Sequence, residues 1–487
     1  MAVDGMQFPN RMNPTDALLW LLDKVPDLRS TVGALMILER APTRQRIREE
    51  FDRLSGELVR MRQRVVEVPL GLAPPEWVED PQFDRDYHLR YVAIPAPGGM
   101  EELLEEISPL FATAFDPERP LWEAYVAEGL AGGRGALFLK MHHCLTDGVG
   151  GARLSEMLLG RKAHATTPAR RRRVAGRPAT PVAMLWRAAW DNLGDAVGAS
   201  GAALRSLTAA ALKPGATLRS IPDYAQTLTG FGRELVARRA ESPLHHQRSL
   251  SRRLSTFDMS LREVNAARER FDATNNDIVL TVVSGAMRRW HSAHGAVPDE
   301  LRVLVPVNLR RQGDATAGNR LALLAVRLPV KEPDPVRRLR LIQEHMGQIK
   351  ADRRATLYPL LARVMTAMPL FIAKQIGRQQ TTRTNFICTN VPGPRTTCYL
   401  AGEAIEKIYP YVPLVGDHPV GIALYSYRDT MSVGLDIDPL AMHDLPYFRQ
   451  ALQEAYDETL NAGRHTQRSA VRPGRRNRPT RQLHAAP

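Results

Sequence analysis

The sequence predicts an α/β fold, arranged as an α+β sandwich in two halves. Helical and strand-like apolar patterns alternate through residues 1–160 and again through residues 253–463. Residues 161–252 break this alternation and read as a basic arm followed by a helical crossover linker. A chain of 487 residues is long enough to bury two cores. We therefore expect two folded halves, a linker between them and a basic disordered tail at 464–487.

The first half opens with a strong helix start at Asn13-Pro14-Thr15-Asp16, which places a capping Asn before Pro at the first helical position. Thr43 is the expected start of a second helix, with Ile47, Phe51 and Leu54 on one face. The strands and the further helix follow from apolar runs and periodicity. We expect strands at 33–38, 65–68, 89–93, 124–126 and 136–141, a helix at 101–113 and a hairpin turn at 132–135.

The second half resumes near Arg253. Asn275 or Asn276 is the expected cap of a helix with an apolar face at 279, 283, 287 and 290. Strands are expected at 303–307, 321–326 and 385–391, and a hairpin joins 420–427 to 431–437. A further apolar stripe, Leu357, Leu361, Val364 and Met368, is either ordinary core or the lining of a lipid tunnel.

The net charge of +14 is confined to two segments, 161–180 and 464–487, which each carry seven basic residues and no acidic ones. Both also contain Pro and few apolar side chains, so we expect them to be disordered. They are either solvated arms or contacts to anionic lipid. Because the folded body is formally neutral, the high pI gives little support for nucleic-acid binding, and no nucleic-acid partner is expected.

Composition also limits location and cofactors. The three cysteines, Cys144, Cys388 and Cys398, are too few for a disulfide framework and suggest a reducing cytosol. The sequence contains no uninterrupted apolar run of about 18 residues, so no spanning helix is expected. The N-terminus does not resemble a secretory signal. No metal-ligand spacing, phosphate loop or dinucleotide fingerprint occurs. We expect a cytoplasmic protein without metal or cofactor, peripheral on the inner face of the membrane or on a lipid droplet.

The most informative motif is His142-His143-Cys144-Leu145-Thr146-Asp147-Gly148, which follows an apolar strand. Neighbouring side chains on a strand point to opposite faces, so only one histidine faces a given cavity. A histidine carries protons near neutral pH because its ordinary pKa is about 6.5. Asp147 followed by Gly148 suggests a tight turn whose carboxylate folds back to brace the imidazole region.

This His-His-x-x-x-Asp-Gly motif is typical of CoA-dependent acyltransferases. Together with Pro120-Leu121-Trp122, Asn276-Asp277-Ile278-Val279-Leu280 and Asn390-Val391-Pro392-Gly393-Pro394, it makes the chain resemble the bacterial wax ester synthase/diacylglycerol acyltransferase family over about residues 6–460. The resemblance implies two chloramphenicol-acetyltransferase-like halves with the active site in a tunnel at their interface. It also implies that His143 is the base and that Asp147 is structural. An arginine of the other half would pair with Asp147, and Arg310 or Arg311 is our candidate.

Acyl transfer to an alcohol needs a base for the hydroxyl proton and a donor for the oxyanion. His143 fits the first role, and His142 then packs against structure. Asn276 is either the oxyanion donor or only a helix cap. Pro120 and Trp122 fit packing better than catalysis. A Cys144 nucleophile is disfavoured because neighbours on a strand diverge.

We therefore expect an acyl-CoA-dependent O-acyltransferase that converts diacylglycerol and acyl-CoA into triacylglycerol and CoA, without an acyl-enzyme. One alternative is a wax ester synthase that uses a long-chain fatty alcohol, and a carrier-bound, condensation-like acceptor is another. A non-catalytic lipid-surface protein of the same fold is a rival of a different class.

Overall fold

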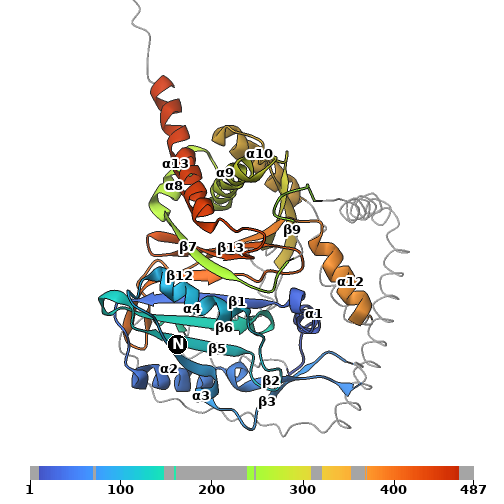
Figure 1. Cartoon of the computed structure of the whole chain (residues 1–487), viewed down its shortest axis with the longest axis vertical. Helices are drawn as coiled ribbons and strands as arrows, with labels where there is room; N and C mark the ends of the chain where they lie inside the picture. The colour runs from blue at the N-terminus through green and yellow to red at the C-terminus, as the bar shows by residue number, and fades with distance from the viewer. Residues whose placement is uncertain are drawn as a thin grey trace, which may run out of the picture.

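The computed structural model describes residues 10–69, 73–146, 158–160, 239–245, 248–308, 321–351, 368 and 370–470. Two six-stranded sheets face each other in the described part of the chain, and most helices pack on their outer sides (Figure 1). The first sheet has the order β11-β12-β1-β6-β5-β4 and the second the order β7-β14-β13-β10-β8-β9. This arrangement confirms the predicted sandwich of helices and sheets, whereas the tunnel between the halves stays a prediction.

The first half contains the predicted helices and strands in the predicted order, together with β3 and α3, which the sequence patterns did not predict. Asn13 Oδ1 accepts a hydrogen bond of 2.9 Å from the Asp16 amide, and Thr43 caps the second helix in the same way. The elements are α1 (Pro14–Asp23), β1 (Thr31–Leu38), α2 (Arg44–Glu57), β2 (Gln63–Val66), β3 (Glu76–Glu79), α3 (Arg85–His88), β4 (Leu89–Ala93), α4 (Met100–Ala112), β5 (Trp122–Glu128) and β6 (Gly135–His142). Short 3-10 turns are η1 (Pro26–Leu28), η2 (Val59–Arg62), η4 (Ala131–Gly133) and η5 (His143–Thr146).

The second half contains helices and strands that the sequence patterns did not predict, notably the strand pair near 399–411. Its elements are β7 (Arg253–Ser260), α8 (Leu261–Arg270), α9 (Asn275–His294), β8 (Leu301–Asn308), β9 (Leu321–Leu328), α10 (Pro335–Ala351), α12 (Leu370–Thr381), β10 (Phe386–Pro392), β11 (Tyr399–Leu400), β12 (Glu403–Tyr411), β13 (Val420–Tyr427), β14 (Thr430–Ile437) and α13 (Leu445–Ala470).

Two details of these elements differ from expectation. Thr274, not Asn275 or Asn276, caps α9, because Thr274 and Asp277 form a reciprocal capping box. Helix α13 continues to Ala470, beyond the predicted start of the disordered tail at residue 464, because the packed apolar face of α13 has already nucleated a helix that the following residues propagate. The remainder of the tail lies outside the described residues.

The chain does not divide its sheets at one point in the sequence. Strand β12 pairs antiparallel with β1, so a segment from the second half completes the first sheet (Figure 1). The predicted boundaries at 160 and 252 stay predictions. The basic arm at 161–180, the Ala-rich stretch at 181–212 and most of the stripe at 357–368 lie outside the described residues.

Three apolar cores hold the layers together. One packs α2 on the outer face of the first sheet, and a second packs α4 on its inner face, where Leu254 of β7 also joins it. The largest core packs α8, α9, α10 and α13 on the outer face of the second sheet. Among the described residues no helix has the length and apolar character needed to cross a membrane.

Candidate active site

The two histidines of the motif lie at a change of backbone structure. Strand β6 ends at His142, which pairs with Thr31 of β1, and His143 begins the 3-10 turn η5. The expectation that both histidines lie on a strand is therefore wrong. The His143 amide still donates a hydrogen bond of 2.8 Å to the Ser30 carbonyl, which continues the register of β6 against β1 by one residue before the chain turns.

His142 is fully buried, and its two ring nitrogens contact different partners. Its Nδ1 accepts a hydrogen bond of 3.1 Å from the Cys144 amide and lies 2.9 Å from Cys144 Sγ. Its Nε2 lies 3.1 Å from Asp23 Oδ1. Since an atom that accepts from an amide carries no proton, the neutral ring is protonated at Nε2, which faces the carboxylate.

Asp23, at the end of α1, is a site residue that the sequence reasoning missed. Burial acts to raise the pKa of Asp23, but the contact with His142 and the hydrogen bond from the Ser30 amide hold it below its ordinary value. Asp23 is thus an anion at neutral pH, within reach of the motif. A lone Asp at the end of a helix gave no sequence signal for this contact.

His143 is partly buried, and its electrostatics suit a base. Burial lowers the pKa of His143, and the nearby positive charge that His142 acquires on protonation lowers it further. A lowered pKa leaves the imidazole neutral at neutral pH, which is the form that can accept a proton.

Cys144 does not suit a nucleophile. Burial raises the pKa of the Cys144 thiol well above its ordinary value, so the thiolate is scarce. Its sulfur lies 2.9 Å from His142 Nδ1, but that nitrogen already accepts a hydrogen bond from the Cys144 amide. All three cysteines are buried free thiols.

Three other predicted site residues, Asp147, Gly148 and Arg310, lie outside the described residues, as does Arg311. The predicted brace by Asp147 and its pairing with an arginine therefore stay predictions. Within the described part of the chain, the carboxylate next to the imidazole of His142 is that of Asp23.

Pro120 and Trp122 occupy packed positions at the start of β5. Trp122 Nε1 donates a hydrogen bond of 2.8 Å to the Met61 carbonyl, and its indole stacks between the rings of Phe51 and His88. His88 Nδ1 in turn lies 2.7 Å from the Trp122 carbonyl oxygen. Pro120 is buried beside them. These contacts fix the start of β5, which pairs with β6 in the first sheet.

Asn276 lies in the first turn of α9, in the other half of the molecule. Its Oδ1 accepts a hydrogen bond of 2.8 Å from Asn390 Nδ2, at the end of β10. Both residues line an open cleft of about 670 Å³ that Arg268 and Ser426 also border. Asn276 and His143 thus have separate immediate surroundings.

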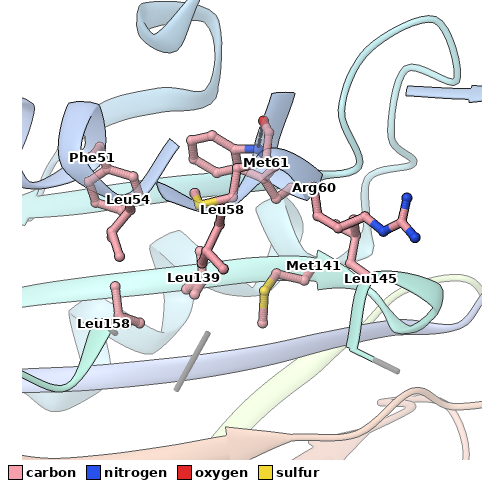
Figure 2. Close-up of a pocket in the computed structure, with 10 residues that line it drawn as sticks. Phe51, Leu54, Leu58, Arg60, Met61, Leu139, Met141, Leu145 and Leu158 are labelled. Atoms are coloured by element: carbon pink, nitrogen blue, oxygen red, sulfur yellow. Dashed lines mark hydrogen bonds between the residues drawn. The ribbon is translucent and has the colours of Figure 1, made fainter. Parts of the chain in front are cut away.

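An apolar pocket lies beside the motif, between α2, η2 and β6 (Figure 2). Met141 and Leu145 border it on either side of the histidines, and Phe51, Leu54 and Met61 close it from above. Its volume is about 20 Å³, which is room for roughly one water molecule. Flexible methionines in the wall give this pocket side chains that can be displaced.

Comparison with known proteins places the chain in a family. A model described as the wax ester synthase/diacylglycerol acyltransferase catalytic domain matches residues 12–279, and its C-terminal companion domain matches residues 317–459. A putative diacylglycerol O-acyltransferase of Mycobacterium tuberculosis is 30% identical over 94% of this chain and 93% of its own length. A probable diacylglycerol O-acyltransferase, tgs1, of the same organism is 29% identical over 87% of this chain and 90% of its own length.

Solved structures share the fold. A wax ester synthase/diacylglycerol acyltransferase from Marinobacter aquaeolei VT8 superposes with a TM-score of 0.63 at 24% identity, covering 93% of this chain and all of that one. The first condensation domain of the CDA synthetase superposes with a TM-score of 0.58 at 15% identity, covering 94% and 97%. The two-sheet architecture is therefore common to this chain and these enzymes.

Proposed function

Since the chain belongs to the wax ester synthase/diacylglycerol acyltransferase family, we propose that it transfers the acyl group of acyl-CoA to diacylglycerol, giving triacylglycerol and CoA. The chain is an acyltransferase of this family. The observation that carries the mechanism is the partly buried His143 at the end of β6, whose pKa is lowered by burial.

His143 acts as the general base in a direct transfer. The neutral imidazole takes the proton of the acceptor hydroxyl while the hydroxyl oxygen attacks the thioester carbonyl. A C–O bond forms, and the tetrahedral intermediate carries a negative oxygen. When the C–S bond breaks, the thiolate of CoA leaves and receives the proton from His143. No acyl-enzyme and no further reactant are needed.

Asn276 is the proposed oxyanion donor. Its amide oxygen is held by Asn390, so the amide nitrogen is the group that remains to donate to a substrate oxygen in the cleft. A preorganised donor of this kind contributes roughly 3–4 kcal/mol of transition-state stabilisation. In this role, Asn276 must lie next to the thioester carbonyl when the substrates are bound.

A long-chain alcohol is the alternative acceptor, because the description of the matching family covers wax ester synthesis as well as diacylglycerol acylation. Both acceptors are lipids, so we also propose peripheral attachment to a membrane or lipid-droplet surface. A non-catalytic protein of the same fold is the rival that an activity measurement excludes.

The experiment is thiol release from palmitoyl-CoA by purified protein, with dioleoylglycerol and hexadecanol offered in parallel in lipid vesicles. His143→Ala is expected to lower kcat by about 10²- to 10⁴-fold, the usual contribution of a general base. His443→Ala, which changes an exposed histidine of the second half, is the matched control. Turnover that persists in His143→Ala would exclude His143 as the base, and no turnover with either acceptor would exclude both lipid reactions.

A further inference from the structure

We propose that Asp23 is a positioning residue for acyl transfer, which holds His142 in one tautomer and thereby fixes the turn that carries His143. The inference rests on the proposed role of His143 as the base. Asp23 itself touches no reacting atom in this assignment. It acts through two neighbours of the base, His142 and Ser30.

The first contact sets the state of the His142 ring. The Cys144 amide donates to Nδ1, so the ring proton is on Nε2, which lies 3.1 Å from Asp23 Oδ1 in a charge contact rather than an aligned hydrogen bond. An ionised carboxylate at this distance favours the protonated Nε2 over the other tautomer. With Asp23 at one end and the Cys144 amide at the other, the ring cannot rotate without losing both contacts.

The second contact reaches the backbone of His143. Asp23 Oδ1 accepts a hydrogen bond of 3.2 Å from the Ser30 amide. The Ser30 carbonyl accepts a hydrogen bond of 2.8 Å from the His143 amide. The Asp23 carboxylate therefore contacts the His142 ring directly and reaches the His143 backbone through Ser30.

The surroundings make these contacts strong. His142 is fully buried, and its ring lies edge-on to Trp20 of α1 and to Phe115. The side chain of Asp23 is 18% exposed. Polar contacts shielded from water in this way are stronger than those on the surface. The low pKa of Asp23, caused by His142 and the Ser30 amide acting against burial, agrees with an ion in this position.

Helix α1 is itself held in place by contacts of its side chains, which fixes the position of Asp23 at its end. Trp20 Nε1 donates a hydrogen bond of 2.9 Å to Glu67 Oε1, and Lys24 forms an ion pair with the same carboxylate. The helix also packs directly on η5. Asp23 thus connects a fixed helix to the turn that carries the base.

The test compares Asp23→Asn, Asp23→Glu and Asp27→Asn in the full chain. Asn keeps the shape of the side chain but removes its charge, whereas Glu restores the charge. Asp27 is the matched control, because it accepts two hydrogen bonds from Arg378 and lies one turn further along the chain. Asp27→Asn removes a carboxylate of the same segment and leaves the contacts of His142 intact.

We expect Asp23→Asn to lower kcat by about 10- to 100-fold, the cost of misplacing a catalytic group by a fraction of a bond length to about 1 Å. The KM for palmitoyl-CoA should stay near that of the wild type, because Asp23 binds no substrate. Asp23→Glu should recover most of the loss, and Asp27→Asn should resemble the wild type. A purely structural role would instead lower the melting temperature and the active fraction of Asp23→Asn and leave the kcat of its folded fraction unchanged.

A second readout does not depend on turnover. In protein with ¹⁵N-labelled histidine, the ring nitrogens of His142 should report a proton on Nε2 in the wild type and a mixture of tautomers in Asp23→Asn. An unchanged tautomer in a folded Asp23→Asn variant, or an unchanged kcat where His143→Ala is inactive, would overturn the proposal. Absence of turnover in the wild type would contradict the proposed function, and the ring tautomer would then decide the positioning role alone.

Discussion

Asn390 Nδ2 donates a hydrogen bond of 2.8 Å to Asn276 Oδ1 and so joins the end of β10 to the first turn of α9. These residues are 114 positions apart in the sequence. The contact orients the amide of Asn276 within the cleft that both residues border. It also gives the second half of the molecule a polar group with a defined direction.

This contact predicts that Asn276 and Asn390 act as a unit. Asn276→Ala should lower kcat by about 10²-fold or more, as loss of an oxyanion donor does, and Asn390→Ala should cost less. The double variant should resemble Asn276→Ala, because Asn390 acts only through its partner. Steady-state kinetics on the four proteins measure the coupling. Effects that simply multiply would show that the two residues act independently.

The pH dependence of activity follows from the pKa of His143. Burial and the neighbouring His142 place this pKa below the ordinary value of about 6.5. A general base works when neutral, so activity should be constant through neutral pH and fall only as the pH drops below that value. The acid limb of kcat/KM, which reports the free enzyme, is the measurement. An acid limb centred above pH 6.5 would contradict the assignment.

Trp122 is predicted to support the fold rather than the chemistry. Trp122→Phe removes the hydrogen bond to the Met61 carbonyl and leaves that carbonyl unsatisfied, which should cost about 1–3 kcal/mol of the free energy of unfolding. The kcat of the folded protein should be largely unchanged. Urea unfolding and kinetics, measured on the same preparation, separate the two effects. A large loss of kcat at unchanged stability would instead place Trp122 in the catalytic machinery.

Stability should depend on a buried acid in the second half. Burial raises the pKa of Asp436 to about 6, although its ion pair with Arg252 acts in the opposite direction. The folded chain therefore holds this proton up to about pH 6, whereas the unfolded chain loses it near about pH 4. Because the folded state binds more protons in this window, the contribution of Asp436 to stability rises as the pH falls through it.

Melting temperatures of the wild type and of Asp436→Asn, measured at pH 7 and pH 5, test this sign. From pH 7 to pH 5, the melting temperature of the wild type should rise relative to that of Asp436→Asn, because Asn does not titrate. A difference that is the same at both pH values would show that Asp436 has the same pKa folded and unfolded.

The sequence predicted most local elements because their signals are local. Asn13 and Thr43 are caps followed by periodic apolar residues, and both helices begin where expected. Thr274 was missed as the cap of α9 because Asn275 and Asn276 beside it are equally good capping types. Strand β12 was missed because its alternation is interrupted, and its pairing with β1 joins residues far apart in the chain.

The site was predictable only in part for a related reason. The motif identified His143 as the base candidate, but the hydrogen bond of its amide to the Ser30 carbonyl depends on the pairing of β6 with β1, which the local sequence does not reveal. Asp23 reaches His142 through the packing of α1 against η5. Contacts of this kind follow from tertiary structure and leave no fixed spacing in the sequence.

The path of the chain through β12 limits how a bulky lipid can enter. Separating the two halves widely would pull β12 away from β1 and expose a row of unpaired amides and carbonyls on β1. That opening would break the pairing of β1 with β12 from Gly33 to Leu38. Substrate entry is therefore expected to use movements of side chains and connecting segments, with the paired strands acting as a fixed frame around which those parts rearrange.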